Sequence, residues 1–413
     1  MRVRVVSVGL GVVSALMLAG VALGQQVVKL GEGETLTISG FINVSLFADR
    51  GRFGAFGQGQ NAEYANQVQP GVSQGFMDGD FRNTRIRFDF ASGPVLGKWS
   101  PRATIEADFF GTFTNVPATG GTPPAAPPFA DEQPQLRARL IYADLTNGRT
   151  TIRIGQDWAP LFAETPVSLT HIAFPLGYGA SGKIGWRFPG VFVFTDLSAA
   201  GAPLNVQLAL AAMKGSGPVL TDPAVGTGEA SGLPQLEGKV TLSKRSGKLS
   251  WSAYAVGHVD WKDTVPPGTP SATMTGTAVE LGGNVAASQL SLHGNVYMGH
   301  AIGQQFGHIT QNAPANGDIH GWGAWAQAGY DLDPHWSAFV YYGLDQPDQA
   351  RLQQDHPGVS LAGFRSQSHV GDALVRFRAG RYAVGLEYFR TVTRWAAGPQ
   401  SADQYALSML YNF

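Results

Sequence analysis

The sequence predicts an all-β protein: a 16-stranded antiparallel transmembrane β-barrel with short periplasmic turns, long extracellular loops and a constriction loop. Three observations predict it. Segments that alternate apolar and polar residues recur at lengths that suit strands tilted across a bilayer. The connections between these segments alternate short and long. The last segment places Tyr405, Leu407 and Phe413 on one face and ends on an aromatic side chain, which is typical of a closing strand in an outer membrane.

The alternating segments begin at Leu36 and continue to the end of the chain. Pro189 lies inside one of them, and the even count depends on that segment remaining a single strand. The segments predicted as strands are 36–48, 82–92, 102–112, 135–146, 149–158, 183–198, 203–214, 236–245, 248–262, 276–287, 289–300, 321–332, 335–345, 367–379, 381–394 and 404–413.

The connections separate into two classes by length. Tight turns are predicted at Asn147-Gly148, Ser246-Gly247, Asp333-Pro334 and Ala379-Gly380, with brief links at 93–101, 199–202 and 287–288. Long loops are predicted at 49–81, 113–134, 159–182, 215–235, 263–275, 301–320, 346–366 and 395–403. A barrel has short turns on one rim and long loops on the other, whereas a soluble sandwich has no reason to sort its loops in this way.

The first residues predict export. Arg2 and Arg4 precede an apolar run, and small residues at Ala22 and Gly24 suit a signal peptidase, so we expect residues 1–24 to be a signal peptide. A membrane-spanning helix is the alternative, but glycines interrupt the short run. The expected organisation is a short periplasmic segment at 25–35 followed by the barrel at 36–413, located in an outer membrane of Gram-negative type and surrounded by its lipid.

Composition agrees with a barrel and excludes several kinds of chemistry. Hydrophobic residues make up 44% of the chain, yet the mean hydropathy is −0.05, because lipid-facing and lumen-facing residues cancel in an average. The absence of cysteine removes disulfides, thiol nucleophiles and thiolate metal sites. The histidines show no pair at metal-ligand spacing, and no basic, aromatic-rich patch suits nucleic acid. We therefore expect no cofactor and no nucleic-acid partner.

Strand parity sends charged side chains into the lumen. Ile86, Phe88 and Phe90 share the lipid face of their segment, so the residues between them face water. An arginine facing lipid near mid-bilayer would cost about 2 to 4 kcal/mol, which enforces this assignment. The same argument along the chain places on the lumen wall Arg85, Arg87, Arg102, Glu106, Asp108, Arg137, Arg139, Arg153, Asp157, Arg376, Arg378 and Glu387.

The arginines are unevenly distributed. Nine lie between residues 82 and 187 and six between 365 and 394, whereas residues 188–350 contain only Arg245. Because closure makes the first and last strands neighbours, one wall of the lumen is predicted to be rich in arginine, with Arg376 and Arg378 brought round towards the first group. The opposite wall is predicted to consist of Ala, Gly, Ser and His.

The third long loop is predicted to fold inward and narrow the pore. Arginines opposite acids such as Asp157 and Glu164 would then set a transverse field across the constriction. The guanidinium fork matches a carboxylate, and rings of cationic side chains select anions. The alternative is that the arginines only pair with acids of the same wall and hold it rigid. The sequence leaves both interpretations open.

Three segments resemble the DcaP-type outer-membrane porins. They are Thr104 to Thr112, with the Asp-Phe-Phe-Gly ending, Leu136 to Asp144, with an Arg-x-Arg pair and a tyrosine, and Arg153 to Phe162, with Gly-Gln-x-Trp. The resemblance implies a 16-stranded homotrimeric channel for small organic anions such as dicarboxylates. The residues that it singles out are Arg137, Arg139, Arg153 and Arg187.

One feature departs from that family. Its members typically carry an N-terminal helical coiled coil, whereas residues 25–35 here are rich in glycine and unsuited to a helix. A trimer tethered by a coiled coil is therefore in doubt. The Pro-rich second loop suits either contact with a neighbouring barrel or a surface position.

The function predicted from these observations is a water-filled porin channel for passive diffusion of small hydrophilic solutes, with a preference for organic anions such as carboxylates. The alternative is a structural or adhesive barrel whose loops close the pore. A barrel hydrolase using Ser168 and His171 is disfavoured, because no nucleophile elbow or orienting acid accompanies them.

Overall fold

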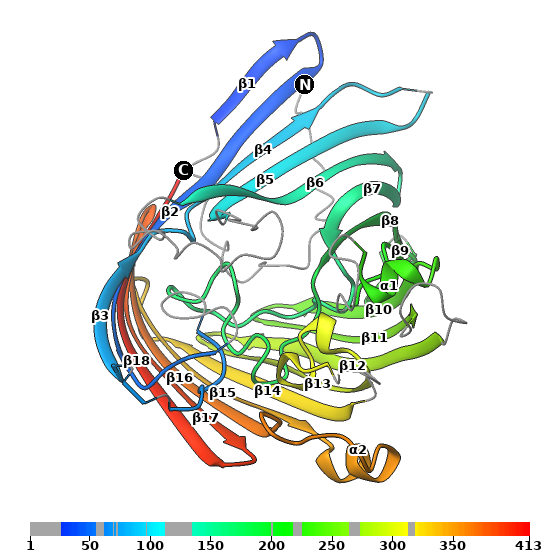
Figure 1. Ribbon diagram of the computed structural model, residues 1–413. Helices are drawn as coiled ribbons and strands as arrows, with labels where there is room; N and C mark the ends of the chain where they lie inside the picture. Colours follow the sequence, from blue (N-terminus) through cyan, green and yellow to red (C-terminus); the bar gives the residue numbers. More distant parts are fainter. Residues whose placement is uncertain are drawn as a thin grey trace.

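The computed structural model describes residues 26–54, 62–68, 70–71, 73–95, 97–111, 134–199, 201–217, 225–263, 273–312 and 319–413. These residues form one antiparallel sheet that closes on itself as a 16-stranded barrel, as predicted (Figure 1). Within the described ranges, no helix has both the length and the apolar character needed to cross a membrane. The predicted signal peptide and most of the Pro-rich second loop lie outside the described residues.

Most of the strands match the predicted segments to within a few residues. In chain order they are β1 (Gln26–Gly31), β2 (Glu34–Arg50), β3 (Gly75–Asp80), β4 (Arg85–Ala91), β5 (Ser100–Gly111), β6 (Gln135–Asn147), β7 (Thr150–Trp158), β8 (Arg187–Asp196), β9 (Asn205–Met213), β10 (Gln235–Ser246), β11 (Leu249–Asp263), β12 (Thr273–Ala287), β13 (Leu290–His300), β14 (His320–Asp331), β15 (Trp336–Pro347), β16 (Arg365–Ala379), β17 (Tyr382–Trp395) and β18 (Gly398–Asn412). Short helices occupy α1 (Thr227–Ala230), η1 (Gly303–Gln305), η2 (His308–Thr310) and α2 (Gln349–Asp355).

Two features explain why the sheet has 18 strand segments although the barrel has 16 strands. β3 and β4 pair in succession with the same strand, β2, so they are two halves of one crossing. The break between them is held by an ion pair from Arg82 to Asp80 at 2.6 Å and by the amide of Asn83, which donates to Asn43. Residues 75–80, predicted as loop, are therefore strand. β1 forms a hairpin with the start of β2, in a segment where no strand was predicted.

The barrel closes where the last strand meets the first. β18 pairs with β2 from Asp403 to Asn412, as the terminal alternation predicts. Phe413 lies beyond the strand, but its N–H donates to the Gly40 carbonyl at 3.0 Å and its carbonyl accepts from the Gly40 N–H. Gly40 has φ of 153°, and a Cβ there would lie 2.2 Å from the Arg85 carbonyl oxygen. A glycine is thus required where the chain end docks.

Alternation along the strands sorts side chains as predicted. On β18, Tyr405, Leu407 and Met409 are exposed on the outer face, whereas Gln404 and Ser408 are buried on the inner face. The inner positions are buried because loops fill much of the lumen. Five of the six buried apolar clusters include residues of these loops as well as of the wall, so the barrel encloses a packed interior.

Two predicted boundaries are wrong. Residues 183–186 belong to a loop, because Lys183 and Ile184 are buried against that loop's other residues, and β8 starts at Arg187. The connection predicted at 395–403 is a tight turn, because β17 and β18 continue to pair up to Trp395 and Gly398. Pro189 is accommodated within β8, opposite Gln156 of β7.

Candidate functional site

Loop 3, residues 159–186, folds from the rim of long loops into the lumen (Figure 1). All of its residues are buried except Thr165, Ile172 and Trp186, which are half-buried. Prolines at three positions prevent the loop from extending the neighbouring strands. At Gly182 (φ 83°) a Cβ would lie 2.4 Å from the Ala324 amide nitrogen, so the backbone of the loop lies directly against the wall. The predicted inward fold of this loop is confirmed.

The tip of loop 3 is held by side chains that point inward from the wall. The Glu387 carboxylate accepts hydrogen bonds from the Ser168 hydroxyl at 2.5 Å and from the Leu169 and Thr170 N–H groups at 3.1 and 3.0 Å. The Gln327 side chain accepts from the Val167 N–H and donates to its carbonyl, at 2.7 and 2.8 Å. The loop tip is thus fixed to β14 and β17, which lie three strands apart on one side of the barrel.

A second loop folds inward beside the first. Residues 301–311 contain η1 and η2, and Phe306 stacks on Tyr178 of loop 3 with ring centroids 4.1 Å apart. Five of its non-glycine residues have left-handed backbone angles, namely Ala301, Phe306, His308, Ile309 and Thr310. Such angles cost free energy, so contacts with the surroundings must hold this segment in place.

Arg137 and Arg139 of β6 form ion pairs with two acids of β5. Arg137 donates to Asp108 at 2.9 and 2.7 Å, and Arg139 donates to Glu106 at 2.9 Å and to Asp108 at 2.7 Å. Arg139 is fully buried and also reaches the Ala173 carbonyl of loop 3. These two arginines therefore brace the wall and seat the loop.

Arg85 and Arg87 extend this group from β4. Arg87 pairs with Asp89 of the same strand at 2.8 Å, and both arginines lie 3.5 Å from Glu106. With Arg137, Arg139 and the nearby Arg187 they form the arginine cluster: Arg85, Arg87, Arg137, Arg139 and Arg187, together with Asp89, Glu106 and Asp108. Five cations face three carboxylates, so the cluster keeps an excess of positive charge.

Arg187 differs from the other members of the cluster. It is buried at the start of β8, and its guanidinium lies over the indole rings of Trp158 and Trp186, 4.8 and 4.4 Å from their centroids. Its Nε and Nη1 atoms have no hydrogen-bond partner, and no acid forms an ion pair with it within the described residues. Arg187 thus differs from the other arginines in having aromatic neighbours and no paired acid among the described residues, although Arg85 also has two donor atoms, Nε and Nη2, without a hydrogen-bond partner.

The remaining predicted arginines lie outside the cluster. Arg153 pairs with Asp144 at 2.7 Å and with Asp157 at 2.5 Å, all on β6 and β7. Asp157 is therefore on the arginine wall itself and does not face it. Arg102 is exposed towards the short-turn end of β5. Arg376 and Arg378 lie towards the short-turn end of β16, where Arg376 donates to Ser337, and in the described structure no contact joins them to the cluster. Their predicted approach to the first group is not seen.

The wall opposite the cluster is charged, so its prediction as Ala, Gly, Ser and His is wrong. Glu237, His258 and Asp260 of β10 and β11 and Glu280 of β12 are all buried there. The physical reason is that loop 3 needs acceptors for its backbone: the Leu161 N–H donates to Glu237 at 2.7 Å. The sequence signal that could have indicated this charged wall is a single acid on a strand of otherwise small residues. Glu387 on β17 is a signal of the same kind.

Two charged side chains of loop 3 face this opposite wall. Glu164 accepts a hydrogen bond from Asn284 at 2.6 Å and lies 3.5 Å from His293. Burial opposes ionisation of Glu164, but His293 and Asn284 outweigh it and hold the pKa of this carboxyl below its ordinary value. Burial lowers the pKa of the Lys183 ammonium to about 7, although Glu280 raises it. Glu164 is therefore held against the wall opposite the arginine cluster, by β12 and β13.

Ser168 and His171, the pair considered for a hydrolase, lie in one turn of loop 3. The Ser168 hydroxyl donates to Glu387 and accepts from the His171 N–H at 2.7 Å, which is the geometry of a loop turn. No cluster of three or more His, Cys, Asp or Glu side chains suitable for a metal ion occurs among the residues that the structure describes.

Comparison with known proteins identifies the fold. No protein-family model and no curated protein matches the sequence. Among solved structures, the outer membrane channel DcaP of Acinetobacter baumannii is similar over 94% of this chain and 99% of its own, with a TM-score of 0.69 and 17% identity. The anion-selective porin from Comamonas acidovorans (TM-score 0.54, 13% identity) and the trimer form of OmpT from Vibrio cholerae (0.51, 10%) are each similar over 92% of this chain and 100% of their own. The predicted resemblance to DcaP is confirmed at the level of the fold.

Proposed function

We propose that this chain is an outer-membrane porin that passes small hydrophilic solutes by passive diffusion and prefers organic anions such as carboxylates. The closed barrel and its likeness to solved outer-membrane channels support the general function. The preference for anions rests on the arginine cluster. Its arginines exceed its acids, and loop 3 packs against it, so a solute that enters the lumen on this side meets positive charge.

The observation that carries the anion preference is the environment of Arg187. Arg87, Arg137 and Arg139 donate hydrogen bonds to carboxylates, which consumes most of their charge, and Arg85 lies 3.5 Å from Glu106. Arg187 instead lies between two indoles with two donor atoms unpartnered, and burying charged donors without partners is unfavourable by about 1 to 3 kcal/mol or more. A carboxylate oxygen in the lumen would satisfy them by a charge-assisted hydrogen bond.

We also propose that the chain is exported by residues 1–24 and assembles as a homotrimer. A trimer form among the similar solved structures supports the assembly. Cross-linking in membranes followed by electrophoresis would test it, and a monomer at all cross-linker concentrations would contradict it.

A closed structural barrel remains the second candidate, and one observation favours it. Residues of loop 1 (Tyr64 and Ala65), loop 3 (Leu176 and Ala180) and Ile309 join a single buried cluster inside the lumen. Loops packed against one another in this way reduce the space for solute. This candidate predicts negligible conductance.

Single-channel recording in planar bilayers tests the proposal. The channel should conduct, and a salt gradient should show permeability for chloride above potassium. Arg187→Gln should lower the anion-to-cation ratio about sevenfold, because a unit charge about 7 Å from the ion path shifts the free energies of an anion and a cation in opposite directions by about 0.6 kcal/mol each in water. Arg245→Gln, which removes an exposed arginine beside a turn, is the matched control. A cation preference in the unchanged protein would refute the anion assignment, and a silent bilayer would favour the closed barrel.

A further inference from the structure

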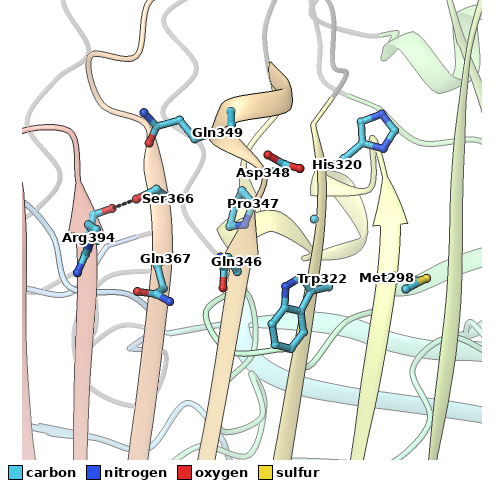
Figure 2. A pocket seen from close by; sticks show the side chains of 12 residues that line it. Met298, His320, Trp322, Gln346, Pro347, Asp348, Gln349, Ser366, Gln367 and Arg394 are labelled. Carbon is cyan, nitrogen blue, oxygen red and sulfur yellow. Dashed lines mark hydrogen bonds between the residues drawn. The ribbon is translucent and has the colours of Figure 1, made fainter. Parts of the chain in front are cut away.

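A row of five side chains crosses the outer surface of the barrel near the rim of long loops. Met298 of β13 pairs with Trp322 of β14, which pairs with Gln346 of β15, and Gln367 of β16 pairs with Arg394 of β17. Figure 2 shows the five side chains side by side at one level of five adjacent strands. We call this set the rim row: Met298, Trp322, Gln346, Gln367 and Arg394.

The rim row faces away from the lumen. The neighbouring positions along the same strands, Asp345, Ser368 and Thr393, are fully buried inside the barrel, and side chains alternate between the two faces of a strand. Met298 and Trp322 are 65% and 41% exposed. On the proposed membrane location, the rim row therefore contacts lipid or lipid headgroups and has no role in the pore.

The positions one step nearer the membrane centre are mostly apolar. Val296, Ala324 and Leu344 are paired across β13 to β15, and Val392 continues the series beyond His369. His369 accepts or donates a hydrogen bond with Tyr342 at 2.7 Å, so its polar edge is engaged. Such a surface suits acyl chains, whereas the amides and the guanidinium of the rim row suit a polar headgroup. The boundary between the two lies directly below the rim row.

A pocket of about 620 Å³ lies over the rim row, beneath the start of α2. His320, Asp348 and Gln349 line its upper side. The Asp348 carboxylate is partly occupied, because it accepts the Arg351 N–H at 2.9 Å as the cap of α2. The volume lies within the range of about 300 to 1,000 Å³ that is usual for small-molecule sites.

Five polar side chains of the pocket are free to bind. The side-chain amides of Gln346, Gln349 and Gln367, the Trp322 indole N–H and the Arg394 guanidinium make no hydrogen bond within the part of the chain that the structure describes. Amides both donate and accept, as hydroxyl groups require, and a guanidinium binds phosphate by its fork. One acid, Asp348, opposes a purely anionic ligand but accepts hydrogen bonds from hydroxyls. The set therefore matches sugar hydroxyls and a phosphate better than a phosphate alone.

We propose that the rim row and its pocket bind the phosphorylated sugar headgroup of an outer-leaflet glycolipid, with the acyl chains lying along the apolar positions below. This inference rests on the membrane location proposed above, but it concerns a surface outside the channel. Trp322 offers an apolar face to the sugar ring and to the lipid, the amides bind hydroxyls, and Arg394 binds phosphate.

Native mass spectrometry of the detergent-solubilised protein tests the proposal with deep-rough lipopolysaccharide and phosphatidylglycerol as probes. The unchanged protein should bind lipopolysaccharide at least tenfold more tightly than phosphatidylglycerol. A triple variant should lose that preference. It combines Gln346→Ala, Gln367→Ala and Arg394→Ala. The matched control, Gln289→Ala with Arg381→Ala at the opposite rim, removes an amide and an arginine and should leave it intact.

Each other result is decisive as well. If the triple variant binds lipopolysaccharide as tightly as the unchanged protein does, the proposed site is wrong. If the triple variant loses affinity for lipopolysaccharide and for phosphatidylglycerol by the same factor, the assignment of a sugar headgroup is wrong. If the triple variant no longer forms cross-linked oligomers but binds both lipids as the unchanged protein does, the surface is a contact between subunits and not a lipid site. Single-channel conductance of the triple variant should match the unchanged protein, which separates this proposal from the channel function. If the triple variant does not fold, as judged by its heat-dependent mobility on gels, Arg394→Gln alone should weaken lipopolysaccharide binding several-fold.

Discussion

Glu387→Ala should release the tip of loop 3 without opening the barrel wall. The Glu387 carboxylate is buried and accepts hydrogen bonds from Ser168, Leu169 and Thr170. The serine hydroxyl can turn to another acceptor, but the two backbone N–H groups cannot. Hydrogen bonds to a charged acceptor contribute about 1.5 to 3 kcal/mol each, so the loss of two makes local opening easier by about 3 kcal/mol at the lower limit.

A change of about 3 kcal/mol corresponds to an opening equilibrium about 150-fold larger. Hydrogen exchange read by mass spectrometry on peptides covering residues 164–174 measures it directly, because exchange of protected amides reports local opening. Glu387→Gln keeps one acceptor oxygen in place and should give an intermediate rate. Tyr388→Phe changes the next residue on the outward face and serves as the control.

The same variants should alter the channel. A loop tip that leaves its seat widens the lumen, so Glu387→Ala should raise the mean conductance and add noise from loop motion. Protection of residues 164–174 that equals that of the unchanged protein would refute the reasoning, because it would mean that Gln327 and the other contacts hold the tip without Glu387. Protection lost throughout the barrel would show that the carboxylate stabilises the wall itself.

Three further results are expected. Arg139→Ala removes the hydrogen-bonded partner of buried Glu106 and one of the two partners of buried Asp108, and should lower the free energy of unfolding in urea by about 3 to 5 kcal/mol; an unchanged midpoint would contradict it. Lys183, with a folded pKa of about 7 against its ordinary 10.5, binds fewer protons when folded, so loop 3 should become more stable as pH rises from 7 towards 10.5, and Lys183→Met should abolish this dependence in hydrogen exchange. Gly185→Ala, with φ of 93° and a Cβ 2.5 Å from the Phe162 nitrogen, should destabilise the protein far more than Gly201→Ala, where φ is 77° and nothing lies within 4 Å; equal melting temperatures would contradict it.

The wall of the barrel was predictable because each strand carries its own signal. Period-two alternation and turn dipeptides are local, so residues such as Asn147-Gly148 and the terminal Tyr405 to Phe413 locate strands without knowledge of their neighbours. The missed strand, β3, is short and rich in glycine and aspartate, which are unfavourable in strands, and it forms only because the continuing length of β2 offers it a partner. The hairpin of β1 depends on β2 in the same way.

The candidate site was only partly predictable. Parity placed Arg137, Arg139 and Glu106 on the lumen wall, but it carried no information on which acid each arginine would contact. Register decides those pairs: Asp108 lies opposite Arg137, whereas Arg187 lies opposite Trp158 and so has an aromatic neighbour and no acid. The roles of Glu387 and Gln327 depend on where an inward-folded loop passes, and that path is set by contacts far apart in the sequence.

The anchoring of loop 3 also sets the order in which the molecule is assembled. The loop is synthesised before half of the barrel, yet its tip is held by Gln327 of β14, Glu387 of β17 and Ser408 of β18. These partners are separated from the loop by 160 to 238 residues. Contacts over such separations form late, because the chain between them must first be ordered. A barrel that is still being inserted therefore has a wide, unfilled lumen, and only completion of the last strand gives the channel its final bore.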